Sequence, residues 1–338
     1  GGVVGKIAAT NGEINGNGTI VNKAKIASTH GQYSILYTAI GGVIGEAMCS
    51  VKGVVNEGDA VYNINSNDGG VYKNIYVGGV VGYANGNLTL TSVENKGTAV
   101  LKITKHTTKK HYNLCVGGVL GTNADDKAVA LVRCVNSGSA AFTGAKSNTN
   151  ENIKGRSIAL GGIVGALTNG GSRISQCTNT GCLSNQPQNT EYRQWIIRSE
   201  GGCNYIGGIA GYLEGAEGDL LEFTNCENNR KEGTDDTVGN SSYAIYAYNG
   251  TSAGLVGGAK YADIRDSQCT TAIYNDRYGV LSGLVAALYL SNLEGCTLAN
   301  SNIKSANKNP VACGGIAGYA DSSTIKDNTL INLQITSN

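Results

Sequence analysis

The chain has 338 residues, and its 26 lysines and arginines nearly balance its 25 aspartates and glutamates, which leaves a formal net charge of +1. This balance gives no basic patch for nucleic acid or for an anionic membrane, and no apolar run approaches the roughly 18 residues that cross a bilayer. Glycine accounts for 50 residues but Pro and Phe for only 2 each, so the composition suits neither a helical core nor a disordered linker.

The first predicted element of each repeat is a glycine-led segment such as GGVVG, with Val, Ile or Leu always in third place. It begins at residues 1, 41, 78, 117, 161, 207, 253, 282 and 314. Short apolar-polar alternation downstream, as in LTLTSV at 88–93, is typical of strands. A unit of this size cannot bury its own apolar face and must stack on its copies. The sequence therefore predicts an all-β fold, a parallel β-helix or β-solenoid of about nine coils with loop insertions, as a single domain over 1–338.

Each repeat continues with a second segment that reads, in its fullest form, apolar-x-x-Cys-x-Asn-x-Gly. We expect the cysteines to form a column of buried free thiols, because earlier repeats place Ile20, Val54 and Val93 there and free Cys behaves as a small hydrophobe. We expect each asparagine to take the left-handed conformation at a corner and to hydrogen-bond the equivalent amide one coil away. The thiol column comprises Cys134, Cys177, Cys226, Cys269 and Cys296, and the asparagine column comprises Asn22, Asn56, Asn95, Asn136, Asn179 and Asn228.

The fourth position of the glycine-led segment is also apolar, as where Val81 follows Val80 and Leu120 follows Val119. Neighbouring residues on a strand face opposite sides. One of the two columns is therefore expected to point out of the coil, where the insertions between repeats would cover it.

The two segments together resemble the GLUG repeat of bacterial surface proteins, which include the immunoglobulin-A-cleaving metallopeptidases and secreted proteins of gut Bacteroidota. The resemblance is carried by GGVLGTNADDKAVALVRCVNSG at 117–138 and GGIVGALTNGGSRISQCTNTG at 161–181, and it weakens after residue 253. It implies a scaffold that brings no catalytic residues. The peptidases use a His-Glu-x-x-His zinc helix, whereas this chain has only His30, His106 and His111 and no such segment.

One polar insertion, LSNQPQNTEYRQWIIRSEGG at 183–202, is flanked by Cys182 and Cys203, which could form a disulfide that ties its base. It holds the only tryptophan of the chain. That ring would either cover the outward apolar column or serve as a platform for a glycan or a host surface protein. The candidate ligand-binding side chains are Trp195, Tyr192, Arg193 and Arg198.

Acidic side chains could serve catalysis in a solenoid if two of them converged on one face. The candidates share no column and are interpreted as solvated loop charges: Asp125, Asp126, Glu214, Glu217, Asp219, Asp235 and Asp236. Asp235 and Asp236 could hold a calcium ion, but two carboxylates without a recognisable ligand spacing are weak evidence for such a site. The basic segment KITKHTTKKHYNL at 102–114 is interpreted as a surface hairpin, with an anionic partner as the alternative. No Cys-x-x-Cys spacing suggests zinc, so neither metal nor cofactor is expected.

These observations favour a non-enzymatic, extracellular or cell-surface β-solenoid, an adhesin-like or stalk segment that presents binding loops. The alternatives are a carbohydrate-active β-helix enzyme of the lyase or glycosidase type and an accessory module of a larger surface protease. The sequence opens on a repeat, so a surface location requires an export signal outside it. An enzyme should bring two carboxylates together in a groove, whereas a stalk should not.

Overall fold

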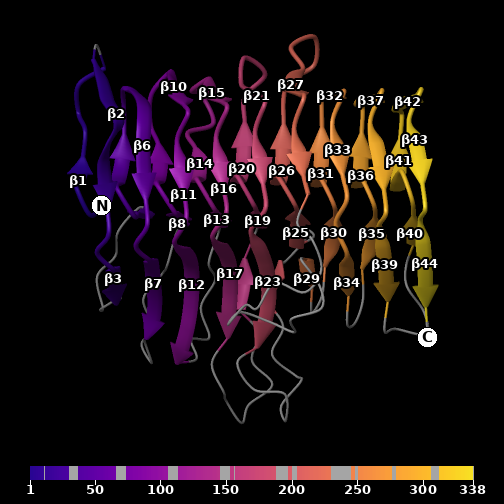
Figure 1. The fold of residues 1–338 in the computed structure, drawn as a ribbon, viewed down its shortest axis with the longest axis horizontal. Coiled ribbons are helices and arrows are strands. Elements are labelled where there is room, and N and C mark those ends of the chain that lie inside the picture. Colours follow the sequence, from indigo (N-terminus) through magenta and orange to yellow (C-terminus); the bar gives the residue numbers. More distant parts are fainter. Residues whose placement is uncertain are drawn as a thin grey trace.

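The computed structural model describes residues 1–10, 12–29, 37–65, 74–105, 113–144, 153–155, 157–187, 197–199, 204–229, 245–247, 250–275, 279–305 and 312–337. These residues form strands joined by turns, and the strands of the four long sheets pair in parallel from one coil to the next (Figure 1). The two chain ends lie at opposite ends of the long axis. The predicted all-β parallel solenoid is therefore confirmed, with nine coils counted along one sheet.

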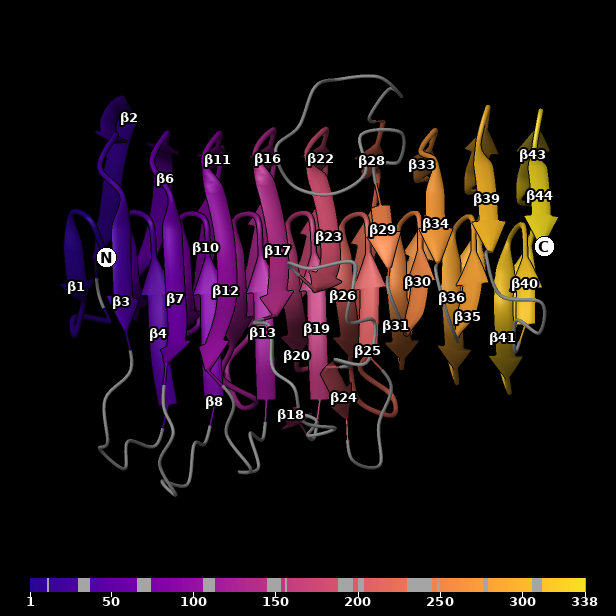
Figure 2. The same cartoon turned by 90° about the horizontal axis from the view of Figure 1, so that it is seen from below.

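The four long sheets are numbered 1 to 4 in the order in which the chain first enters them. One coil visits these sheets in a fixed order, as the third coil shows. Strand β8 (Asn74–Gly78) lies in sheet 4, and β9 (Val81–Ala84) follows in sheet 1 after the glycine corner. The chain then passes through β10 (Leu88–Thr91) and β11 (Glu94–Asn95) of sheet 2 into β12 (Thr98–Lys105) of sheet 3. Seen from the second direction, the coils succeed one another along the rod (Figure 2).

The remaining strands repeat this order, except that the described part of the first coil has no strand in sheet 4 and that the first two coils each pass through sheet 2 in a single strand. Sheet 1 contains β1 (Val4–Lys6), β5 (Ile44–Ala47), β14 (Leu120–Asn123), β20 (Val164–Thr168), β26 (Ala210–Glu214), β31 (Val256–Lys260), β36 (Val285–Tyr289) and β41 (Ala317–Asp321). Sheet 2 contains β2 (Glu13–Asn22), β6 (Ser50–Asn56), β15 (Val129–Val132), β16 (Val135–Asn136), β21 (Arg173–Ser175), β22 (Thr178–Asn179), β27 (Leu221–Thr224), β28 (Glu227–Asn228), β32 (Ala262–Arg265), β33 (Gln268–Cys269), β37 (Asn292–Glu294), β38 (Thr297–Ala299), β42 (Thr324–Lys326) and β43 (Thr329–Ile331).

Sheet 3 contains β3 (Ile26–Thr29), β7 (Ala60–Asn65), β17 (Ser139–Gly144), β23 (Cys182–Pro187), β29 (Ile245–Ala247), β34 (Ile273–Asn275), β39 (Asn302–Ser305) and β44 (Gln334–Ser337). Sheet 4 contains β4 (Tyr37–Gly41), β13 (Asn113–Gly117), β19 (Ser157–Gly161), β25 (Asn204–Gly207), β30 (Thr251–Ala253), β35 (Val280–Ser282) and β40 (Ala312–Gly314). Strands β18 (Ile153–Gly155) and β24 (Ile197–Ser199) pair separately.

Both apolar columns of the glycine-led segment point into the core, so the expectation of an outward-facing column is wrong. Val80 and Val81 are fully buried in the same cluster. Their two amides donate to a single carbonyl, that of Val119 in the next coil, at 3.1 and 2.9 Å. This shared acceptor is a bulge at the corner, and it cancels the usual alternation of side chains. The insertions therefore have no outward apolar column of this kind to cover.

The asparagine column forms a hydrogen-bonded ladder through the interior of the first six coils. Each side-chain Nδ2 donates to the Oδ1 of the next asparagine at 2.8 to 3.0 Å. The ladder ends where Asn228 donates to the carbonyl of Gly254 at 2.7 Å. Because these amides are buried, each rung satisfies polar groups that would otherwise be costly to place inside the coil. The rungs are Asn22, Asn56, Asn95, Asn136, Asn179 and Asn228.

The expectation that the ladder asparagines take the left-handed conformation is wrong. Positive φ angles instead occur three residues before the ladder asparagine in the third to sixth coils, for example at Ser92, Arg133 and Asn225, with φ of 52°, 52° and 54°. These residues sit at the turn between the two strands of sheet 2, immediately before the position of the thiol column. The asparagine itself is extended in a short strand, which directs its amide along the rod axis.

The thiol column runs through the core as expected, except in the seventh coil. Cys134, Cys177, Cys226 and Cys296 are fully buried free thiols. Cys269 is also buried and free, but it pairs in register with Asn228 and so belongs to the asparagine column.

Ser267 fills the thiol position of the seventh coil. Its hydroxyl donates to the carbonyl two residues earlier, at 2.7 Å, as the Cys226 thiol does at 3.4 Å. Serine therefore makes the same hydrogen bond to the turn as the cysteine does, whereas Ile20, Val54 and Val93 fill the position in the first three coils without one. The left-handed residue of that turn, Asp266, stands one place before Ser267. It fixes the register in which Ser267, and not Cys269, occupies the thiol position.

We expect the buried thiols of Cys269 and Cys296 to make the protein less stable in alkaline solution. Burial raises the pKa of Cys269 and of Cys296 from 9.0 to about 11. Between these values the unfolded chain releases protons that the folded chain retains, so the free energy of unfolding should fall as pH rises from about 9 to about 11, by about 2 kcal/mol per thiol. Urea titrations across this range measure the slope. Cys296→Ser should fold, since Ser267 occupies the same position one coil away, and should show a shallower slope. An unchanged slope in this variant would contradict the assignment.

Candidate ligand-binding groove

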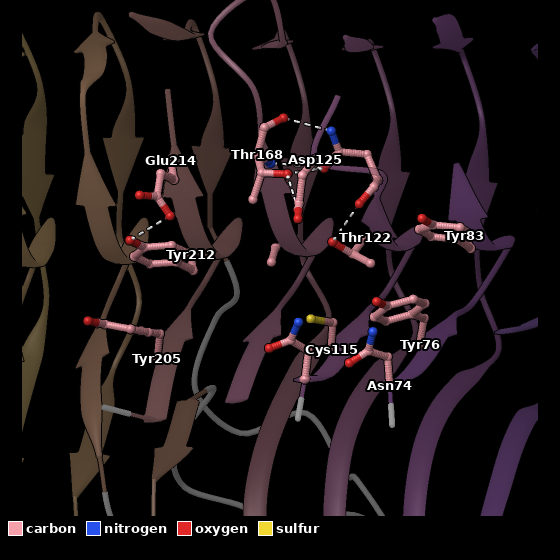
Figure 3. A pocket seen from close by; sticks show the side chains of 13 residues that line it. Asn74, Tyr76, Tyr83, Cys115, Thr122, Asp125, Thr168, Tyr205, Tyr212 and Glu214 are labelled. Carbon is pink, nitrogen blue, oxygen red and sulfur yellow. Dashed lines mark hydrogen bonds between the residues drawn. The ribbon is translucent and has the colours of Figure 1, made fainter. Parts of the chain in front are cut away.

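A groove of about 600 Å³ lies where the outer faces of sheets 4 and 1 meet at the glycine corner (Figure 3). Its lining alternates with core residues along each strand: Ile75 and Val77 belong to the core, and Tyr76 between them points the other way. The groove extends over four coils, from β8 and β9 to β25 and β26. Its volume lies in the range of small-molecule sites.

Two pairs of stacked tyrosines stand at the two ends of the groove. At one end the rings of Tyr76 and Tyr83 lie 4.9 Å apart with an interplanar angle of 22°, and Tyr37 packs 4.9 Å from Tyr83. At the other end Tyr205 and Tyr212 lie 4.8 Å apart at 25°. Each pair takes one ring from sheet 4 and one from sheet 1. The stacking holds the rings in fixed orientations as the end walls of the groove.

Small side chains form the floor between the two aromatic walls. In sheet 4 the register runs from Tyr76 through Cys115 and Ala159 to Tyr205. The walls are thus three coils apart, or about 14 Å at the spacing of neighbouring strands. Burial raises the pKa of Cys115 to about 12, so its thiol stays protonated at neutral pH and serves as an apolar part of the floor.

Polar side chains from the strand ends of sheet 1 form the upper rim (Figure 3). Thr168 donates from Oγ1 to Asp125 Oδ1 at 3.2 Å. Glu214 forms an ion pair with Lys260 at 2.9 Å and accepts a hydrogen bond from the Tyr212 hydroxyl at 3.2 Å. Both carboxylates therefore already have partners within the protein. The described residues that line the groove include two carboxylates and neither lysine nor arginine.

A further carboxylate lies beside the first aromatic wall but is committed to structure. Glu46 accepts hydrogen bonds from the Tyr37 hydroxyl at 2.7 Å and from Asn85 at 2.8 Å, and it pairs with Lys6 at 3.0 Å. Burial works against the charged form of Glu46, but hydrogen bonds from Asn85, Tyr37 and Lys6 outweigh it and lower its pKa. Glu46 is therefore ionised, and its carboxylate holds the Tyr37 hydroxyl in place.

The acidic candidates from the sequence fall into different places. Asp125 and Glu214 line the same groove, at different offsets from their glycine-led segments, so the structure brings together two residues that shared no column. Asp126 is exposed and pairs with Lys127. Glu217 and Asp219 belong to the turn after β26. Among described residues, no group of three or more His, Cys, Asp and Glu side chains is arranged to hold a metal ion.

The insertion that was predicted to bind ligand lies outside the described residues. This applies to Tyr192, Arg193 and Trp195, to the side chain of Arg198, to Asp235 and Asp236, and to residues 106–112 of the basic segment. Cys182 is buried at the start of β23, whereas Cys203 is also outside that set. The proposed disulfide and the tryptophan platform thus stay predictions.

The tyrosine walls could have been found from the sequence. Tyr76 and Tyr83 stand two residues before and five residues after the start of the glycine-led segment at 78, and Tyr205 and Tyr212 occupy the same offsets around 207. No family model, curated protein or solved structure matches the chain. No helix in the described part of the chain is long and apolar enough to cross a membrane.

Proposed function

We propose that this chain is a non-enzymatic, cell-surface or secreted β-solenoid, an adhesin-like or stalk segment that binds an extracellular partner. The resemblance to the GLUG repeat supports this role, since that repeat is a scaffold of bacterial surface proteins. The observation that carries the proposal is the groove, which combines aromatic walls with a small number of polar groups, as binding sites do. Insertions such as 183–202 would add contacts to the same scaffold.

The second candidate function is a carbohydrate-active enzyme, and the presence of Asp125 and Glu214 in one groove favours it. Glycoside hydrolysis requires two carboxyl groups directed at one bond, one of them as an acid. Here Glu214 is directed to Lys260 and Tyr212, and Asp125 to Thr168. Each carboxylate is thus engaged by its own coil or the next one, which supports binding over hydrolysis.

An assay of binding and cleavage on the same material tests the proposal. The purified chain should be retained on an array of surface glycans and host proteins, and should release no new reducing ends or unsaturated sugars from the retained glycans. The double variant D125N/E214Q should also be retained on the array and should also release no product. Product release that disappears in the double variant would establish the enzyme instead.

A further inference from the structure

We infer that the groove binds a linear, neutral oligosaccharide that lies along the solenoid axis, with its two ends against the tyrosine walls. This inference rests on the proposed binding function and specifies its ligand. The observations that support it are the four tyrosines, the floor of small residues between them and the charge of the rim.

The axial orientation follows from the shape of the groove. The walls are formed by coils three steps apart, while Cys115 and Ala166 leave the space between them free of large side chains. A ligand must therefore be elongated along the rod to contact both walls. A compact ligand could touch only one of them, because the separation of about 14 Å exceeds the reach of a single ring.

The aromatic walls select the chemistry of the ligand. Aromatic rings offer flat apolar faces with a negative quadrupole, which pack against the C–H faces of sugar rings. Tyr83 and Tyr212 also carry hydroxyl groups that can bond to sugar hydroxyls. Their rings are already ordered by stacking at 4.9 and 4.8 Å with Tyr76 and Tyr205, so little side-chain entropy would be lost on binding.

The rim excludes acidic polysaccharides. Asp125 and Glu214 place two carboxylates at the groove, where Lys260 pairs with Glu214 at 2.9 Å and the described residues that line the groove include neither lysine nor arginine. A uronic acid or sulfated sugar would meet the Asp125 carboxylate as a like charge and would have to compete with Glu214 for Lys260, which costs affinity. Neutral sugars instead supply hydroxyl donors that carboxylate oxygens and the Thr168 hydroxyl can accept.

An extended peptide fits the groove less well than a glycan. Peptides that bind sheets usually add a strand at a free edge. Here the strands that border the groove are paired on both sides within sheets 4 and 1, as β13 is with β8 and β19. The backbone therefore offers no open edge at this position.

Calorimetric titration with neutral oligosaccharides tests the inference. The probes are linear β-1,4-glucan, β-1,4-mannan and α-1,4-glucan chains, each from disaccharide to hexasaccharide. For at least one series, affinity should rise with length until the chain reaches both walls and then level off. Affinity should not depend on salt concentration, in contrast to binding of a cationic peptide.

Single variants locate the ligand at both walls. Tyr83→Ala and Tyr205→Ala should each reduce affinity for the long chains by about tenfold, while Tyr83→Phe keeps the ring and should lose less affinity than Tyr83→Ala. Tyr319→Ala is the matched control, because Tyr319 lies in the same column as Tyr83 and Tyr212 but outside the groove, where it is 46% exposed. Melting temperatures of all variants separate lost contacts from lost folding.

The possible outcomes separate a failure of the proposed ligand from a failure of the proposed function. If the folded protein binds none of these chains at millimolar concentration, or binds them equally after Tyr83→Ala and Tyr205→Ala, the inference is overturned while a non-enzymatic scaffold role stands. Preference for acidic chains, or salt-sensitive capture of a cationic peptide in the groove, also overturns it. Cleavage of the bound chain would instead overturn the proposed function.

Discussion

Asn136→Asp should lower the free energy of unfolding by about 3–5 kcal/mol, because it places an unpaired charge in the interior. Asn136 is fully buried. It accepts from Asn95 at 2.8 Å and donates to Asn179 Oδ1 at 2.8 Å. An aspartate can still accept from Asn95, but its second oxygen would face the Asn179 oxygen with no donor between them. Urea denaturation followed by circular dichroism measures the loss.

The matched control for this variant is Asn332→Asp. Asn332 also donates to an asparagine one coil away, Asn300, at 3.0 Å, but this pair is exposed to solvent. Water can solvate the new carboxylate there, so stability should change by less than about 0.5 kcal/mol. Equal losses at the two positions would show that the ladder does not depend on burial.

Gly118→Ala should destabilise the protein by about 3 kcal/mol, because the corner has no room for a side-chain carbon. A β-carbon at this position would collide with the Gly162 carbonyl oxygen of the next coil and would lie 2.6 Å from Asn136 Nδ2. Backbone of the next coil cannot yield without breaking the pairing of both corner strands. The expected result is a lower urea midpoint and a lower melting temperature.

Gly5→Ala is the control for the corner glycine. Gly5 also belongs to a glycine-led segment, yet an added β-carbon there meets nothing within 4 Å. The substitution should leave the melting temperature nearly unchanged. A wild-type melting temperature for Gly118→Ala would mean that the coils are not as closely spaced at the corner as described.

The fold could be predicted because repetition turns each sequence position into a column. A glycine that recurs with a fixed relation to Val80 and Val119 requires a close approach at every coil, and a recurring asparagine finds its own copy one coil away. The orientation of the corner residues could not be predicted in this way. It depends on two amides sharing one carbonyl, and the letters of a strand give no sign of such a bulge.

The misplacement of Cys269 has a similar cause. The distance from the glycine-led segment to the cysteine varies between repeats, so sequence letters alone aligned Cys269 with Cys226. The structure aligns Ser267 there, since the backbone register is fixed by the left-handed turn residue Asp266. Serine and cysteine are both small side chains that donate a hydrogen bond, so one can replace the other at this position although the residue type differs.

The groove as a whole could not be predicted from the sequence, because its residues come from four repeats and two sheets. Taken alone, no one of its tyrosines is distinguished by the sequence from the rest of the 18 in the chain. Only the corner angle brings position two before and position five after the glycines to the same side, as with Tyr205 and Tyr212. Aromatic residues at both offsets of one repeat are therefore the pattern to search for in related arrays.

The asparagine ladder also gives the rod an electrical direction. From Asn22 to Asn228, every side-chain amide donates toward the next coil, and each one after Asn22 accepts from the coil before it. Six dipoles aligned head to tail polarise one another, as in other hydrogen-bonded chains. A break in the middle therefore weakens rungs on both sides, while a break at Asn22 weakens those on one side only. Although the net charge of the chain is close to zero, the interior of its first six coils carries an aligned dipole.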